Sequence, residues 1–385
     1  MQKRIRIVSI GIILIVLFIS AIILNNNTNN KHTFKKDGIL YALSLDGKSI
    51  TSFPSKGLYK ANVSCEGADG KWLYDDWKLA IENITGDVSC DIKFETITKT
   101  YFNDYITGLA GTTQGTEQVV NENGYRYEGK NPNNYVWFNN EYWRIIGVFD
   151  TEVVKSDNTT ESKSLVKIIR ADVLDGLAWN KSGTNDWTAA SLNKLLNGAY
   201  YNAQDGTSSG YCYGYRTTAT ANCDYTKKGI QSGYRSMIAN VTWYLGGYSS
   251  TSATAESFYG YERGTTVYSG SPTTTTGYIG LMYPSDYGYS VLSSSCARTT
   301  KLKYYDSSDT CADQSWLYGK GDEWTISPSS SKSSYVFLLS FRGHGIDSTN
   351  FPSDGYGVRP VLYLDASVYK IDGEGTLDKP YIIGM

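Results

Sequence analysis

One polar loop near the C-terminus combines the side chains that could best bind a ligand. It runs between two apolar stretches, residues 335–341 and 358–364, which are expected to form strands. Cationic, amide and carboxylate groups on a loop between rigid strands can fix a polar ligand by converging hydrogen bonds. The candidate ligand-binding residues of this region are Trp324, Arg342, His344, Asp347, Asn350 and Tyr356.

A purely structural role is the alternative for the cations of this region. Arg342 and His344 fit either interpretation. Arg359, which follows the loop, is better explained as a partner for a carboxylate or for carbonyl groups beneath it, because a buried guanidinium needs such acceptors.

Catalysis has little support in the sequence. The only histidines are His32 and His344, and His32 falls in the N-terminal tether described below. Residues 206–210 match G-x-S-x-G, but no apolar strand precedes them, as a nucleophile elbow requires. An extracellular hydrolase that uses Ser208 and His344 is therefore the last-ranked hypothesis, and no catalytic residue is assigned.

Three acidic residues could supply oxygen ligands to a calcium ion. Asp306, Asp309 and Asp313 surround Cys311, and carboxylates on an extracellular loop are suitable Ca²⁺ ligands. Their spacing differs from that of an EF-hand loop, and a solvated acidic loop is the alternative. Calcium is thus the one metal that these residues could bind, and no other metal or cofactor is expected.

Six cysteines fall into three pairs that are close in the sequence. The chain has no C-x-x-C motif and no His-rich cluster, so zinc or thioredoxin-like chemistry lacks ligands at a workable spacing. Disulfides are the better interpretation, and they require an oxidising compartment. The expected bridges are Cys65–Cys90, Cys212–Cys223 and Cys296–Cys311.

Residues 1–24 have the pattern of a signal anchor. Lys3, Arg4 and Arg6 precede residues 7–24, an apolar run without a charged residue that can span a bilayer as a helix. The run is longer than that of a signal peptide and lacks a small-x-small site, although cleavage stays an alternative. We expect a single-pass cell-membrane protein with a polar tether at 25–34 and the bulk of the chain extracellular.

Residues 35–97 are expected to form a small β-sandwich-like module. Apolar and polar residues alternate in 59–65, 77–82 and 88–94, as in strands with one buried face. Cys65 and Cys90 fall on the apolar faces of their strands. This placement predicts a bridge across a sandwich-like core.

Residues 98–385 are expected to form a mixed domain with few helices and long loops. Residues 186–199 and 238–245 have apolar residues at helical spacing, and Asp186 is a plausible N-cap. Asn139-Asn140-Glu141 resembles a short hairpin turn. Strands are expected at 135–138, 142–149, 335–341 and 358–364. The predicted fold class of the whole chain is α+β.

Several motifs of this region resemble an uncharacterised family of bacterial cell-surface domains. They are residues 143–148 (WRIIGV), 187–197, 280–288 (GLMYPSDYG), 357–362 (GVRPVL) and 373–382. That family is distantly similar to the formylglycine-generating-enzyme branch of the C-type-lectin-like fold. The resemblance implies a lectin-like scaffold with a ligand-facing loop before the last strand. It does not imply the enzyme, because the sequence lacks a reactive cysteine pair near its terminus and the lectins' calcium motifs.

Binding is the function that these features favour. A net charge of -2 gives no electrostatic footprint for nucleic acid. The 33 tyrosines, with many Ser, Gly and Asn, are typical of adaptable recognition surfaces, although Tyr also fills half-exposed strands. We expect a membrane-anchored adhesion or binding protein whose lectin-like domain contacts a glycan, a peptide or a surface protein. A structural subunit of a pilin-like assembly is the alternative.

Overall fold

A computed structural model describes residues 23–24, 33–36, 39–111, 113–114, 117–305, 311–319, 321–340 and 345–385. The chain divides into two compact units, Met1–Lys99 and Thr100–Met385. Strands make up 41% of the structure and helices 13%, so the protein is mostly β and the predicted α+β class was wrong. The longest helix of the described residues, α3 (Ala255–Glu262), has only eight residues.

The predicted single-pass membrane anchor is not supported. In the described part of the chain, no helix is long and apolar enough to cross a membrane. Ile23 and Leu24, which were expected to end that helix, form β1 (Ile23–Leu24) and pair with β2 (Thr33–Lys36). Ile is as compatible with a strand as with an apolar helix. Residues 1–22 of the expected anchor and 25–32 of the expected tether lie outside the described residues.

The first unit is organised around three long strands. β3 (Ile39–Leu45) runs parallel to β8 (Val88–Thr96), and β5 (Tyr59–Glu66) pairs with the other edge of β8 in antiparallel register. β4 (Lys48–Ser49) pairs with β3. Ile92 and Phe94 of β8 are fully buried because β8 is the central strand and its apolar residues all face one side.

A hairpin of β6 (Asp69–Leu73) and β7 (Lys78–Glu82) packs near the bridge between Cys65 and Cys90. A Cβ added to Gly70 would lie 2.3 Å from the Cys65 sulfur, so only glycine allows this approach. The two cysteines are direct register partners on β5 and β8. The bridge therefore joins neighbouring strands of one sheet, and the expectation that it crosses a sandwich core was wrong.

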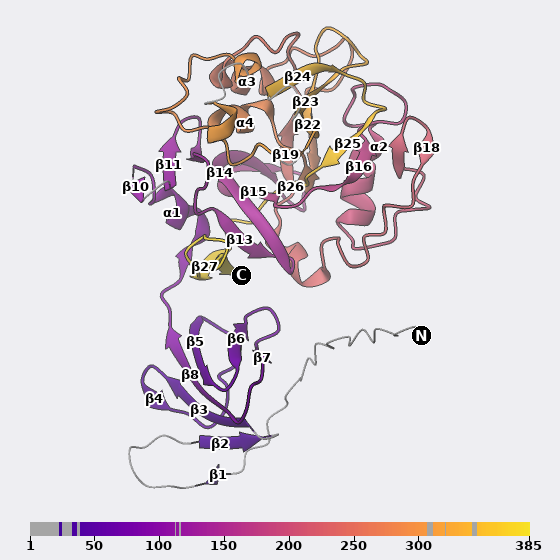
Figure 1. Cartoon of the computed structure of the whole chain (residues 1–385). Coiled ribbons are helices and arrows are strands. Elements are labelled where there is room, and N and C mark those ends of the chain that lie inside the picture. Colours follow the sequence, from indigo (N-terminus) through magenta and orange to yellow (C-terminus); the bar gives the residue numbers. More distant parts are fainter. Residues whose placement is uncertain are drawn as a thin grey trace, which may run out of the picture. The chain divides into compact units, whose positions relative to one another are not determined.

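The second unit is built on the long hairpin of β14 (Glu141–Val154) and β15 (Thr160–Arg170), which crosses the unit in Figure 1. β13 (Tyr135–Phe138) precedes β14 through Asn139 and Asn140, both with positive φ, which confirms the predicted turn at these two residues. Glu141, which was expected in the turn, is the first residue of β14. This hairpin belongs to a sheet of 13 strands. Its other strands are β9 (Thr100–Tyr101), β10 (Thr113–Gln114), β11 (Glu117–Asn121), β12 (Tyr125–Glu128), β19 (Val241–Tyr244), β20 (Thr274–Gly277), β21 (Ile279–Gly280), β26 (Val361–Tyr363), β27 (Tyr369–Asp372) and β28 (Tyr381–Gly384).

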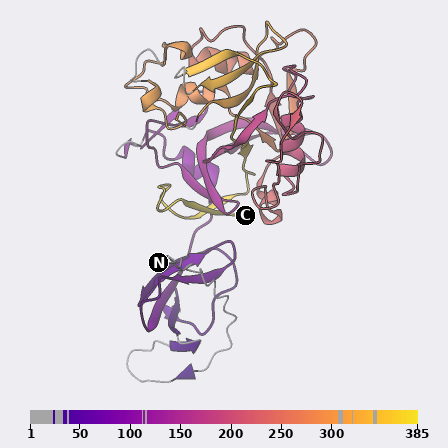
Figure 2. The same ribbon diagram turned by 45° about the vertical axis from the view of Figure 1, so that its right-hand side comes forward.

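The end of the chain returns to the beginning of this unit. β28 pairs in parallel with β13, and β27 pairs with β9, next to α1 (Phe102–Thr107). Figure 2 shows these yellow C-terminal strands beside the purple start of the unit. These two pairings bring the last strands of the chain next to α1, whose Phe102 and Ile106 side chains are buried.

A second sheet of five strands carries most of the predicted site. Its order is β16 (Leu174–Ala178), β25 (Gly355–Val358), β22 (Glu323–Pro328), β23 (Val336–Ser340) and β24 (Gly345–Asn350). The expected single strand over 358–364 is divided between β25 and β26, since Pro360 has no N–H for a ladder. A small hairpin, β17 (Tyr213–Tyr215) and β18 (Thr218–Ala219), lies beside β16 and β25.

The helices are short, and only one of the two predicted helices exists. α2 (Ser191–Leu195) continues into the π-helical turn η1 (Leu196–Tyr200). Its N-cap is Ala190, because the Asp186 side chain instead accepts hydrogen bonds from Thr188. The predicted helix over 238–245 is strand β19. The remaining helical segments are η2 (Ser232–Met237), α4 (Pro284–Ser290), η3 (Leu302–Tyr304) and η4 (Ala312–Gln314).

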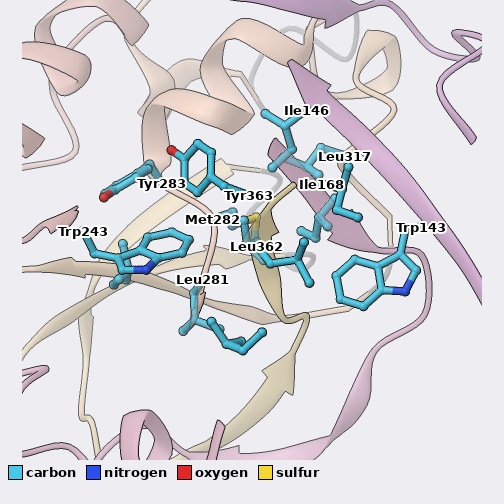
Figure 3. Packing of buried hydrophobic residues seen from close by; sticks show 14 of the residues in the cluster. Trp143, Ile146, Ile168, Trp243, Leu281, Met282, Tyr283, Leu317, Leu362 and Tyr363 are labelled. Carbon is cyan, nitrogen blue, oxygen red and sulfur yellow. The ribbon is translucent and has the colours of Figure 1, made fainter. Parts of the chain in front are cut away.

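Large aromatic side chains fill the core of the second unit. Trp143 from β14 and Trp243 from β19 are both at most 1% exposed. Figure 3 shows them on opposite sides of aliphatic side chains that include Ile168 and Leu362. Disulfides Cys212–Cys223 and Cys296–Cys311 close loops of this unit, which confirms the prediction of disulfide-bonded cysteines close in sequence.

Candidate functional site

The predicted ligand-binding residues fall on the five-stranded sheet or outside the described residues. Trp324 of β22 is 1% exposed, and its Nε1 donates to the carbonyl of Leu177 at 2.8 Å. Tyr356 of β25 packs edge-on against Trp324, with ring centroids 4.9 Å apart. Trp324 thus supports Tyr356 from inside the fold and is not accessible to a ligand.

Strand β24 holds two further candidates. Asp347 is half-buried, and Asn350 is only 9% exposed. The Nδ2 of Asn350 has no hydrogen-bond partner among the described residues. Arg342 and His344, which were expected to contact the ligand most directly, lie outside the described residues.

Arg359 is a buried partner of a carboxylate, as its structural interpretation predicts. Its Nε donates to Glu323, and both side chains are 1% exposed. Its NH2 donates to the carbonyl of Leu317 at 2.8 Å. The pair joins β22 to the segment between β25 and β26 beneath the sheet.

The described residues do not assemble the predicted calcium site or a nucleophile site at Ser208. Asp306 and Asp309 lie outside the described residues, and Asp313 is exposed on η4. Within the described ranges, no group of three or more His, Cys, Asp or Glu side chains could hold a metal ion. Ser208 is exposed in a loop, without the strand and helix of a nucleophile elbow.

A different surface, beside β16 and β25, gathers exposed aromatic rings. We call it the tyrosine surface. Tyr215 is 47% exposed and Tyr211 37%. Its members are Tyr211, Tyr213 and Tyr215, with the cations Lys181, Lys194 and Arg216. Figure 1 shows β16, β18, β25 and α2, which support it, on the same side of the unit.

Each cation of the tyrosine surface lies over a tyrosine ring. Lys181 Nζ is 4.6 Å from the ring centroid of Tyr213 and donates to its hydroxyl at 2.9 Å. The Arg216 guanidinium lies 5.0 Å from the Tyr215 centroid. Such contacts are weakly stabilising at exposed positions, but they hold the rings and the N–H donors side by side. Burial raises the pKa of neighbouring Asp354, and Arg216 opposes that shift.

Backbone contacts fix the hairpin that carries these rings. The disulfide Cys212–Cys223 anchors it, and both cysteines are buried. The Arg216 N–H donates to the carbonyl of Ser353 at 2.5 Å. On β25, a Cβ added to Gly355 would lie 2.0 Å from the carbonyl oxygen of Gly214. The rings therefore sit on a rigid support and not on a loose loop.

Gly355→Ala is expected to displace the β17–β18 hairpin. The added methyl meets backbone, which cannot rotate away, so the free energy of unfolding should fall by about 1–3 kcal/mol. Urea unfolding of the full chain measures this loss. Gly233→Ala is the matched control, because nothing lies within 4 Å of its added Cβ. Equal stability of the two variants would contradict the close packing.

The sequence contains one signal for this surface. Residues 211–215 read Tyr-Cys-Tyr-Gly-Tyr, three tyrosines around a cysteine and a glycine. A disulfide at the centre of an aromatic run indicates rings held at the surface, because the cysteine side chain points inward. Lys181 could not be assigned to the same surface from its position in the sequence.

The comparisons with known proteins found no match among family models, curated proteins or solved structures.

Proposed function

We propose that this chain is an exported binding protein that holds a carbohydrate polymer on the tyrosine surface. The observation that carries the proposal is the set of exposed rings of Tyr211 and Tyr215 next to three cations on a fixed support. The three disulfides are consistent with an extracellular protein.

The chemistry of the surface fits sugars well. One face of a pyranose ring is a layer of C–H groups that packs on an aromatic ring, while its hydroxyl groups need hydrogen-bond partners at the edge. Tyrosine rings supply the flat contact at a small loss of conformational entropy. The Lys181, Lys194 and Arg216 side chains supply N–H donors beside them, and anionic sugars would add charge attraction.

Changing Tyr211 and Tyr215 to Ala is expected to weaken glycan binding about tenfold or more. Each stacked ring contributes about 0.5–1.5 kcal/mol beyond its buried area, and about 1.4 kcal/mol is a factor of ten. The full chain, made in an oxidising compartment, is titrated with cell-wall polysaccharides and with neutral and anionic oligosaccharides. Tyr304→Ala is the control, because Tyr304 is also 47% exposed but belongs to η3.

Two results would overturn the proposal. In the first, Y211A/Y215A binds each glycan as tightly as Y304A does. In the second, the chain binds no glycan and assembles with itself in a way that the same substitutions abolish, which would favour a structural subunit of a surface assembly.

A further inference from the structure

A lysine and an aspartate are in direct contact deep inside the second unit. Lys167 belongs to β15 and Asp286 to α4, and the Lys167 Nζ lies 2.5 Å from the Asp286 Oδ2. The two side chains are 1% and 2% exposed. They are 119 residues apart in the sequence. The amine and the carboxyl group are therefore in direct contact inside the protein.

Aromatic rings enclose the amine on several sides. The Nζ of Lys167 lies 4.3 Å from the ring centroid of Tyr283 and within 6 Å of the centroids of Phe149, Trp243 and Tyr363. Figure 3 shows Trp243, Tyr283 and Tyr363 together at one side of the core. This enclosure excludes water from the contact. Burial lowers the pKa of Lys167 to about 8, although Asp286 opposes the shift.

The carboxyl group is held from its other side. Arg126 NH1 donates to Oδ1 at 3.2 Å, and the backbone N–H of Tyr283 donates to Oδ2 at 2.9 Å. Arg126 itself is 1% exposed and donates to the carbonyls of Glu122 and Asn123. Oδ1 is thus polarised by a fixed cation, while Oδ2 faces the amine.

We propose that Lys167 and Asp286 are joined in the mature protein by an intramolecular amide bond. The Nζ–Cγ bond forms and the Cγ–Oδ2 bond breaks. One ammonium proton first passes to Oδ2, which leaves a neutral amine with a lone pair for the attack. After the attack the nitrogen loses a second proton to the same oxygen, which departs as water. An ammonium and a carboxylate thereby give a neutral amide, so the reaction needs no oxidant, nucleotide or other co-reactant.

The surroundings supply the factors that such a reaction requires. The contact makes the attack intramolecular, which replaces the entropy loss of bringing two molecules together. The Arg126 guanidinium at Oδ1 is placed to stabilise the negative charge of the tetrahedral intermediate. Exclusion of water favours the amide over its hydrolysis. The same groups form a stable ion pair before the reaction, so folding brings the reactants together first.

The bond would tie the central hairpin to α4. β15 lies in the 13-stranded sheet and α4 carries seven buried residues. A covalent link between segments so far apart in the sequence restricts the unfolded chain strongly. Such a link suits an exported protein, and it does not depend on the proposed carbohydrate binding.

Peptide mapping of the full chain tests the bond directly. The purified protein is denatured, reduced and digested, and the masses of its peptides are measured. We expect one joined species that contains Lys167 and Asp286 and is lighter than the two separate peptides by one water. Recovery of both peptides separately, at their full masses, would overturn the proposal whatever the variants do.

Two variants on the same strand show that the link is specific. Lys167→Arg keeps a cation but should give only separate peptides. Lys163→Arg, whose side chain is 38% exposed at the other end of β15, should keep the joined species. A joined species that persists in K167R would assign the link to another residue and contradict the proposal.

Discussion

Arg359→Met is expected to lower the free energy of unfolding by about 3–5 kcal/mol. The change leaves the Glu323 carboxylate inside the protein without its guanidinium partner, and both side chains are 1% exposed. An uncompensated buried charge is more destabilising than the lost hydrogen bonds alone. Denaturant unfolding of the full chain, followed by near-UV circular dichroism, measures the effect.

The double variant R359M/E323L separates the buried charge from the packing. Replacing both partners by apolar groups removes the uncompensated charge, so much of the lost stability should return. Lys379→Met is the control, because the Lys379–Glu374 pair is 67% and 64% exposed and should contribute less than about 1 kcal/mol. An R359M substitution that is no more destabilising than K379M would contradict the conclusion that the Arg359–Glu323 pair is buried.

The stability of the second unit is expected to fall by up to about 3 kcal/mol as the pH rises from about 4.5 to about 7. Burial raises the pKa of Glu262 to about 7, and the nearby Arg263 and Ser285 only partly oppose it. Over this range the folded protein keeps a proton that the unfolded chain loses. The stabilising contribution is therefore complete below the unfolded pKa and is lost as the pH rises through the folded one.

Glu262→Gln should remove this part of the pH dependence. An amide keeps the size of the neutral carboxyl group and does not titrate, so the difference between wild type and E262Q should vary with pH. Glu256→Gln on the same helix is the control, since Glu256 is exposed in the first turn of α3. Parallel curves for wild type and E262Q between about pH 5 and about pH 8 would contradict the raised pKa.

Features set by neighbouring residues could be predicted from the sequence. Asn139 and Asn140 adopt positive φ with little strain, so their turn and the strands on either side followed from residue type. The alternation of apolar and polar residues in 59–65 and 88–94 likewise predicted strands β5 and β8, because every second side chain of a strand faces the same side. Each cysteine had one other cysteine close to it in the sequence, so the disulfide pairs could also be predicted.

Features set by distant residues could not be predicted in this way. Ile238, Val241 and Leu245 have helical spacing, but Val241 and Trp243 alternate with polar residues and pair with β14 and β20. Sheet pairing outweighed a local pattern that fitted both structures. The apolar run likewise predicted a membrane helix that includes Ile23 and Leu24, whereas these two residues form strand β1.

The sequence by itself determined the short-range features: the Asn139-Asn140 turn, the alternating strands and the cysteine pairs that bridge. Only the tertiary structure decided that Lys181 lies over the ring of Tyr213 and that Lys167 touches Asp286. The physical reason is chain length. A local pattern fixes what a few neighbouring residues do, whereas contacts across more than a hundred residues depend on which sheets and helices pack together.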